Sequence, residues 1–129
     1  MKFLMGVAFC FSLLVFPAVA AELLPPLEIQ QKFMGRWVRP DGGYVIHVRD
    51  IKPGGAVDAG YYNPNKIHVA EAHVAVWKGF NQLFIKLDDK GYPGSTYTLY
   101  YFADQDQMAG FYYQAAANQI FEVLFVRMK

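Results

Sequence analysis

From Arg36 to Arg127, aromatic and β-branched residues alternate with polar residues over short runs that end in turn-forming residues. An alternation with a period of two is typical of strands that bury one face. Clusters of Pro, Gly, Asn and Asp, such as Pro40-Asp41-Gly42-Gly43 and Asn63-Pro64-Asn65, separate the runs and favour tight turns. The pattern predicts eight strands, at residues 36–39, 44–50, 56–62, 67–77, 82–87, 95–102, 108–115 and 119–127.

The connections between these strands restrict how they pair. Most are short turns, and residues 88–94 form the longest predicted connection. Antiparallel neighbours accept short turns, whereas parallel strands need long crossovers, and no helix-length amphipathic segment is available between the strands. We therefore predict an all-β fold, an eight-stranded antiparallel up-and-down β-barrel, in which closure removes exposed strand edges. An open β-sandwich is the alternative that the same spacing permits.

The first residues of the chain have the pattern of a signal peptide. Lys2 precedes an uncharged, mainly apolar stretch from Phe3 to Phe16, and Ala18-Val19-Ala20 supplies the small residues of a cleavage site. The apolar stretch is shorter than the roughly 20 residues that a transmembrane helix needs. We expect residues 1–20 to be removed, which implies a periplasmic or secreted protein with no membrane insertion afterwards.

A short lead-in separates this segment from the strands. Pro25-Pro26 predicts the start of a helical turn within residues 21–34, because proline fits the first turn of a helix. The β-barrel domain is then expected at residues 35–129.

Cysteine content and charge restrict the classes of partner. Cys10 is the only cysteine, and it lies inside the predicted signal peptide, in a setting unlike that of a lipid attachment site. The mature chain would have no disulfide, so its stability would come from packing. Removal of Lys2 leaves equal numbers of basic and acidic residues. A neutral chain without a basic run argues against nucleic acid and anionic membrane surfaces as partners.

The two ends of the strand region carry a recognisable pattern. Gly35 and Trp37 form a Gly-x-Trp motif at the first strand, and Arg127 closes the last strand. With the segments 108–112 and 121–127, this pattern resembles the calycin signature of lipocalin- and avidin-like barrels. The resemblance implies structural roles, in which Trp37 plugs one end of the barrel and Arg127 lays its guanidinium across the indole. It also implies an interior that holds a small ligand, but it names no ligand, because the several interior tryptophans of avidins are missing.

Tyrosine is abundant, with nine residues in the chain. In register, several tyrosines share strand faces with Ile46, Val57 and Leu99, and we expect these faces to point inward. Buried phenols need hydrogen-bond partners, so they either pair with one another or contact a ligand, and both outcomes stay open. By strand parity, the loops at Asn63-Pro64 and at residues 90–95 share one end of the barrel and would frame an entrance there. The candidate ligand-binding residues are Tyr44, Tyr61, Asn63, Tyr92, Tyr97, Tyr101, Tyr112 and Gln114.

Groups that serve metal binding are scarce. His68 and His73 are five residues apart on one predicted strand, so they point to opposite faces. Glu71 and His73 share a face, but two ligands are too few for a closed site. We therefore predict no metal site and no cofactor.

Groups that serve catalysis are scarce as well. No Ser stands in a Gly-x-Ser-x-Gly elbow, no cysteine remains after cleavage, and no glycine-rich phosphate loop precedes a helix. We assign no catalytic residue.

These observations favour an exported, non-enzymatic barrel that binds a small ligand with an apolar body and a few polar groups. The main alternative is a protein-binding module, such as an inhibitor of an exported hydrolase, that uses its loops or outer wall and keeps its interior filled. An enzyme is the third candidate. A cavity of ~300 Å³ or more would favour the small ligand, and a dense interior would favour the inhibitor.

Overall fold

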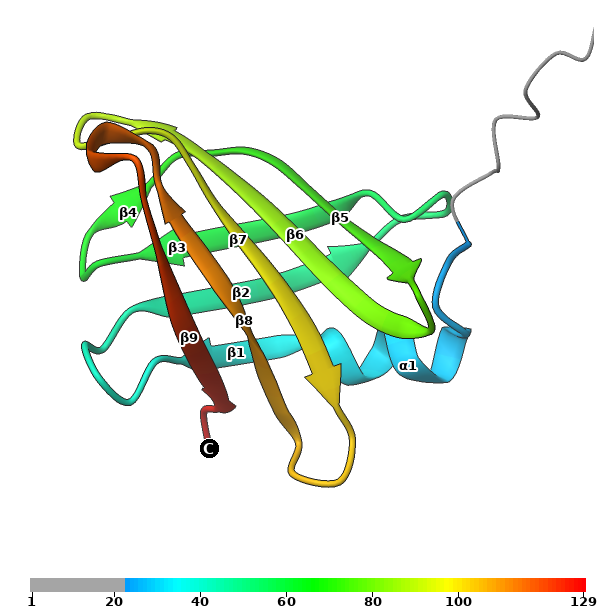
Figure 1. The fold of residues 1–129 in the computed structure, drawn as a ribbon. Coiled ribbons are helices and arrows are strands. Elements are labelled where there is room, and N and C mark those ends of the chain that lie inside the picture. Colours follow the sequence, from blue (N-terminus) through cyan, green and yellow to red (C-terminus); the bar gives the residue numbers. More distant parts are fainter. Residues whose placement is uncertain (1–22) are drawn as a thin grey trace, which may run out of the picture.

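The computed structural model describes residues 23–129 of the chain (Figure 1). The predicted signal peptide, residues 1–20, lies outside the described residues. Within residues 23–129, no helix has both the length and the apolar character that a membrane crossing requires.

The described residues form one short α-helix, nine strands and a single 3-10 turn. The helix α1 (Leu27–Phe33) lies within the lead-in, where the sequence predicts a helical turn. The strands are β1 (Gly35–Val38), β2 (Val45–Ile51), β3 (Val57–Tyr62), β4 (Lys66–Ile67), β5 (Val69–Trp77), β6 (Phe80–Asp89), β7 (Tyr92–Phe102), β8 (Gln107–Gln114) and β9 (Gln119–Arg127). The 3-10 turn η1 (Ala115–Ala117) joins β8 to β9.

All nine strands belong to one antiparallel sheet, in the order β4-β3-β2-β1-β9-β8-β7-β6-β5. The sheet curls until its two ends meet, as Figure 1 shows. At the seam, Ala56 and His73 form an isolated bridge, and the backbone N–H of Val74 donates to the carbonyl of Gly55 at 2.9 Å. The chain is therefore an all-β, nearly closed antiparallel barrel, and not two packed sheets.

The strand count is nine, so the prediction of eight strands was wrong. The predicted strand at residues 67–77 is divided at His68 into β4, which pairs with β3, and β5, which pairs with β6. The His68 carbonyl accepts from the backbone N–H of Asp88 at 3.0 Å, and the His68 N–H donates to the Asp89 carboxylate at 2.7 Å. The alternation of side chains did not reveal this division, because the two parts differ only in the strand with which their backbones pair.

The prediction of a long connection at residues 88–94 was also wrong. β6 and β7 continue into a hairpin, with Asp89 paired to Tyr92 across the turn at Lys90-Gly91. Gly91 has a φ of 85°, which favours glycine in a tight turn. Pro93 fits β7 because pairing with β8 begins only at Thr96, so the missing N–H of the proline breaks no bond on that side.

The end of the barrel beside α1 is filled by large side chains. Trp37 is fully buried, and its indole N–H donates to the carbonyl of Phe33 at 2.9 Å. The guanidinium carbon of Arg127 lies 4.3 Å from the centroid of the Trp37 ring, and the two residues are paired in the β1–β9 register. The same guanidinium donates to the Asp106 carboxylate at 2.7 Å and to the carbonyl of Met34 at 2.8 Å. These contacts hold α1, β1 and the end of β9 together around the indole of Trp37.

Candidate functional site

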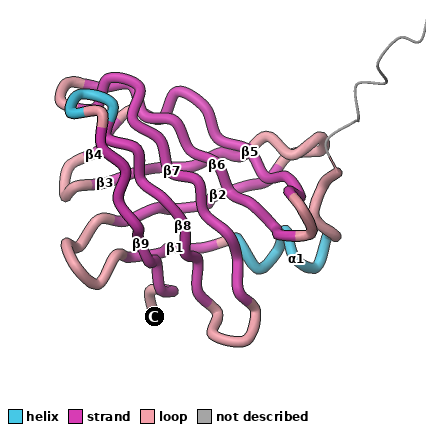
Figure 2. Tube along the Cα trace, in the orientation of Figure 1, coloured by secondary structure: helices cyan, strands magenta, loops and turns pink. Residues whose placement is uncertain are grey.

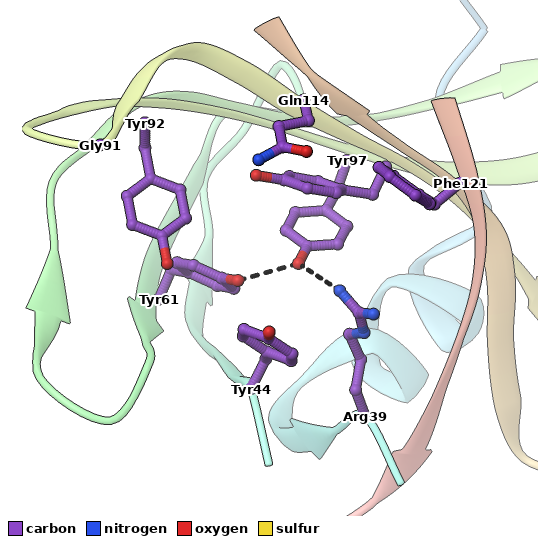
Figure 3. Close-up of a pocket in the computed structure, with 9 residues that line it drawn as sticks. Arg39, Tyr44, Tyr61, Gly91, Tyr92, Tyr97, Gln114 and Phe121 are labelled. Carbon is purple, nitrogen blue, oxygen red and sulfur yellow. Dashed lines mark hydrogen bonds between the residues drawn. The ribbon is translucent and has the colours of Figure 1, made fainter. Parts of the chain in front are cut away.

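The other end of the barrel holds a pocket. Figure 2 shows the turns that follow β1, β3, β6 and β8 at the end opposite α1. The pocket at this end has a volume of about 470 Å³ and is partly open to solvent. Its lining residues, drawn in Figure 3, are Arg39, Tyr44, Tyr61, Gly91, Tyr92, Tyr97, Tyr112, Gln114 and Phe121.

One wall of the pocket is an aromatic shelf that spans three neighbouring strands. Tyr97 of β7 is paired with Tyr112 of β8, and Tyr112 is paired with Phe121 of β9. Side chains that are directly opposite in a sheet lie on the same face, so these three rings line up across the strands. The centroids of Tyr97 and Tyr112 are 4.6 Å apart with 30° between the ring planes. Those of Tyr112 and Phe121 are 6.4 Å apart at 24°, so successive rings of the shelf are close to parallel.

A chain of hydrogen bonds crosses the floor of the pocket. The hydroxyl groups of Tyr61 and Tyr97 are 2.8 Å apart, and Arg39 Nη1 donates to the Tyr97 hydroxyl at 3.1 Å (Figure 3). Both phenols are fully buried. Burial raises the pKa of Tyr97 to about 12, although the hydrogen bonds with Tyr61 and Arg39 offset part of that effect. Burial also raises the pKa of Tyr61, and Tyr97 raises it further. Both groups are therefore neutral phenols at physiological pH.

Arg39 is the one charged side chain among the lining residues. Its side chain is only 12% exposed, and its guanidinium carbon lies 4.4 Å from the centroid of the Tyr44 ring. Nε and Nη2 both donate to the carboxylate of Asp41, at 3.0 and 2.7 Å. Burial lowers the pKa of Arg39, but the hydrogen bonds to Asp41 and Tyr97 outweigh burial and hold that pKa above its ordinary value. The Asp41 side chain is 64% exposed and does not line the pocket.

The rim of the pocket joins two of the turns. Asn63, which follows β3, donates its side-chain N–H to the hydroxyl of Tyr92, which begins β7. The rings of Tyr61 and Tyr92 meet edge to face, with centroids 6.1 Å apart. The two loops that strand parity assigns to one end of the barrel are thus in direct contact.

Of the eight residues that the sequence suggests for a ligand site, six line this pocket: Tyr44, Tyr61, Tyr92, Tyr97, Tyr112 and Gln114. Asn63 lies at the rim, where it holds Tyr92. Tyr101 does not line this pocket. It faces inward on β7, as Tyr97 does, but lies toward the other end of the barrel. Its ring is 6.2 Å from that of Trp37, and its hydroxyl donates to Asp106 at 2.9 Å. Strand parity gives the face of a residue and does not give the end of the barrel.

Three lining residues, Arg39, Gly91 and Phe121, were not among the eight, although Gly91 lies in the loop at residues 90–95 that was expected to frame the entrance. Arg39 shares the strand parity of Trp37, and Phe121 shares that of Phe125, which is buried. Extending the inward parity of Trp37 and Phe125 by one or two steps would have found both. Arg39 was missed because it reads as an ordinary exposed strand end beside a turn.

The histidine and acidic residues considered for a metal lie elsewhere. Within residues 23–129, no group of three or more His, Cys, Asp or Glu side chains is close enough to hold a metal ion. His73 Nδ1 is 3.5 Å from a carboxylate oxygen of Glu71, and the His73 ring stacks on Phe84 with centroids 5.0 Å apart. These residues are unconnected to the pocket.

Comparisons of the chain with protein-family models, with curated proteins and with solved structures find no match. The function is therefore inferred from the geometry of the pocket.

Proposed function

We propose that this protein is an exported, non-enzymatic β-barrel that binds a small, partly apolar ligand in the pocket lined by Tyr61, Tyr97 and Tyr112. One observation carries this proposal: the end of the barrel opposite the buried Trp37 holds a partly open pocket that is lined mainly by aromatic side chains. The pocket of about 470 Å³ falls within the range of small-molecule sites, roughly 300–1,000 Å³. Export rests on the signal-peptide pattern at residues 1–20.

The polar groups of the pocket divide into two sets. Tyr61, Tyr97 and Arg39 bond to one another, which fixes the floor before any ligand arrives. The Tyr44 hydroxyl and the Gln114 amide line the pocket but form none of the side-chain hydrogen bonds within residues 23–129. These two groups are available to bond a ligand, while the aromatic shelf offers an apolar surface. A ligand with an apolar body and a few polar groups matches that lining.

The lining also supports binding over catalysis. Proton transfer near neutral pH is usually performed by His, Asp, Glu, Cys or Lys, and none of these lines the pocket. Burial raises the pKa of Tyr61, Tyr97 and Tyr112, so these phenols donate hydrogen bonds and do not act as bases.

We also infer a relationship to the lipocalin- and avidin-like barrels. The supporting features are the nearly closed antiparallel barrel, the short helix that leads into Gly35-x-Trp37, and the contact of Arg127 with the indole. No ligand carries over from those proteins. Trp77, the other tryptophan, is 48% exposed and so cannot serve as an interior tryptophan of the avidin type.

Native mass spectrometry tests the binding proposal. Protein purified without denaturation from its own export compartment is expected to carry a small molecule at equal stoichiometry. The variant Gln114→Trp places a bulky ring in the pocket and should lose that molecule. Its matched control is Tyr113→Trp, on the neighbouring residue, whose side chain does not line the pocket. A retained small molecule that survives Gln114→Trp would contradict the proposed site.

A specific observation favours the second candidate, a protein-binding module. Large apolar side chains are exposed on β5 to β9, and Ile120 is the most exposed of them at 69%. Such patches are typical of protein contact sites. They include Trp77, Phe80, Phe102, Phe111, Ile120 and Leu124. In the same mass spectra, an adduct of protein size that is lost in Phe111→Ser and kept in Gln114→Trp would favour this candidate.

A further inference from the structure

The pocket carries a positive charge whose ion-pair partner lies outside the pocket. Arg39 is its one charged lining residue, and the partner carboxylate of Asp41 is mostly exposed to water. Water screens the Asp41 charge on its outer side, whereas the pocket side of the guanidinium faces neutral phenols. Inside a partly buried site, such a cation attracts an anion more strongly than it would on the surface.

The guanidinium of Arg39 also has N–H groups that no hydrogen bond to another described residue uses. An arginine carries five N–H groups, and three are used here, two by Asp41 and one by Tyr97. The remaining two, one on each terminal nitrogen, have no partner among residues 23–129. Figure 3 shows the guanidinium directed into the cluster of phenols. A pair of free N–H groups on a planar fork suits the oxygens of a carboxylate or sulfonate.

The shape of the apolar wall adds a second constraint. Neighbouring rings of Tyr97, Tyr112 and Phe121 are tilted by 30° and 24°, and with centroids only 4.6 Å apart Tyr97 and Tyr112 lie face to face, so the shelf is a stack of rings that a planar ligand ring can join. Aromatic rings stack favourably in offset, near-parallel arrangements. The hydroxyl of Tyr97 joins this shelf to Arg39, which places an aromatic surface and a cationic group side by side.

We infer that the pocket selects small organic anions: molecules with a planar ring body that stacks on the shelf and a single carboxylate or sulfonate group held by Arg39. This inference rests on the proposed function, because it names the class of ligand for the same pocket. Tyr44 and Gln114 would then hydrogen-bond the remaining polar atoms of the ligand.

Two fluorescent probes with the same ring body test the charge selection. Anilinonaphthalene sulfonate is an anion, and phenylnaphthylamine lacks the sulfonate and is neutral. Both are titrated into the purified protein and into the variants Arg39→Met, Asp41→Asn and Gln114→Trp. The matched control is Arg49→Met, because Arg49 is also paired with an aspartate, Asp58, at 2.9 Å but does not line the pocket.

We expect the wild-type protein to bind the anionic probe more tightly than the neutral one. Arg39→Met should weaken binding of the anionic probe by ~10-fold or more, since a hydrogen-bonded charge is lost, and should weaken binding of the neutral probe far less. Asp41→Asn should strengthen binding of the anionic probe, because it removes a competing carboxylate. Arg49→Met should change neither. Asp41→Asn keeps the inference testable if Arg39→Met does not fold, which melting temperatures will show.

Each other result has a distinct meaning. If both probes bind equally, and Gln114→Trp abolishes both while Arg39→Met and Asp41→Asn change neither, the anion inference is overturned and the proposed pocket stands. If neither probe binds, or if Gln114→Trp leaves binding of both unchanged, the proposed function fails, and the inference fails with it.

Discussion

The hydroxyl groups of Tyr61 and Tyr97 lie 2.8 Å apart, although the two residues are 36 positions apart in the chain. Each phenol is fully buried, and each hydroxyl is the hydrogen-bond partner of the other. This contact belongs to the floor of the pocket, so it stabilises the barrel as well as shaping the site. Tyr44 lines the same pocket without such a partner, which separates the two roles experimentally.

Tyr61→Phe and Tyr44→Phe should therefore have different effects, although both remove one hydroxyl. Tyr61→Phe breaks the bond to Tyr97 and should lower the free energy of unfolding by about 1 kcal/mol. Tyr44→Phe should leave stability nearly unchanged and weaken ligand binding by about 1–3 kcal/mol, because the ligand loses a buried partner. Chemical denaturation and ligand titration on both variants measure the two effects. Loss of stability in Tyr44→Phe with unchanged affinity would remove Tyr44 from the binding site.

The buried phenols predict a loss of stability in alkaline solution. The ordinary pKa of tyrosine is 10.0, and in the folded protein the pKa of Tyr97 is about 12. A group whose pKa is raised by folding stabilises the folded state fully below its unfolded pKa, and this contribution is lost as pH rises through the folded pKa. We expect the free energy of unfolding to fall between pH 10.0 and about 12.

Denaturant unfolding across that pH range measures this loss, and Tyr97→Phe should make it shallower. Tyr113, a half-buried tyrosine that lies outside the pocket and donates to Asn118, provides the control Tyr113→Phe. If the free energy of unfolding falls equally with pH in Tyr97→Phe and in the wild type, burial does not raise the pKa of Tyr97 as described.

Trp37 and Arg127 should be energetically coupled. Trp37→Ala should cost about 3–5 kcal/mol, the range for a large buried aromatic side chain. Arg127→Ala should cost less, and the double variant should cost less than the sum, because the guanidinium lies 4.3 Å from the indole centroid. Arg49→Ala, at an exposed ion pair, should change stability by under about 1 kcal/mol. Strict additivity in the Trp37–Arg127 cycle would contradict a contact that stabilises the closed end.

Gly110 is expected to tolerate no side chain. A Cβ atom at this position would lie 2.0 Å from the carbonyl oxygen of Thr98 on β7, so the strands would have to separate. Gly110→Ala should destabilise the barrel by about 3 kcal/mol or more. The comparison is Gly43→Ala, where a Cβ would meet nothing within 4 Å and only the positive φ of 68° opposes the change. Equal effects of the two substitutions on thermal unfolding would mean that β7 and β8 are not packed as described.

The sequence predicts the inner face of the barrel well because side-chain direction repeats every two residues. Tyr97 and Tyr112 are placed on one face by that rule, and the structure joins them in the pocket. The rule does not position a residue along the barrel axis, so Tyr101 was grouped with them although it lies beside Trp37.

Contacts that depend on long-range pairing could not be predicted. The bond from Arg39 to Tyr97 spans 58 positions, and although strand parity with Trp37 gives the face of Arg39, nothing near Arg39 in the sequence indicates this partner. The division of a predicted strand at His68 is a change of backbone partner, which leaves no mark in the alternation of side chains.

An NMR titration of the isotope-labelled protein with the anionic probe tests the central claim, that a small ligand binds inside the open end of the barrel. We predict that the amide signals of Tyr44, Tyr61, Tyr97 and Gln114 shift with a single binding isotherm, while those of the outer-wall residues Phe111, Ile120 and Leu124 stay in place. Shifts confined to Phe111, Ile120 and Leu124, with the pocket signals unchanged, would contradict the claim.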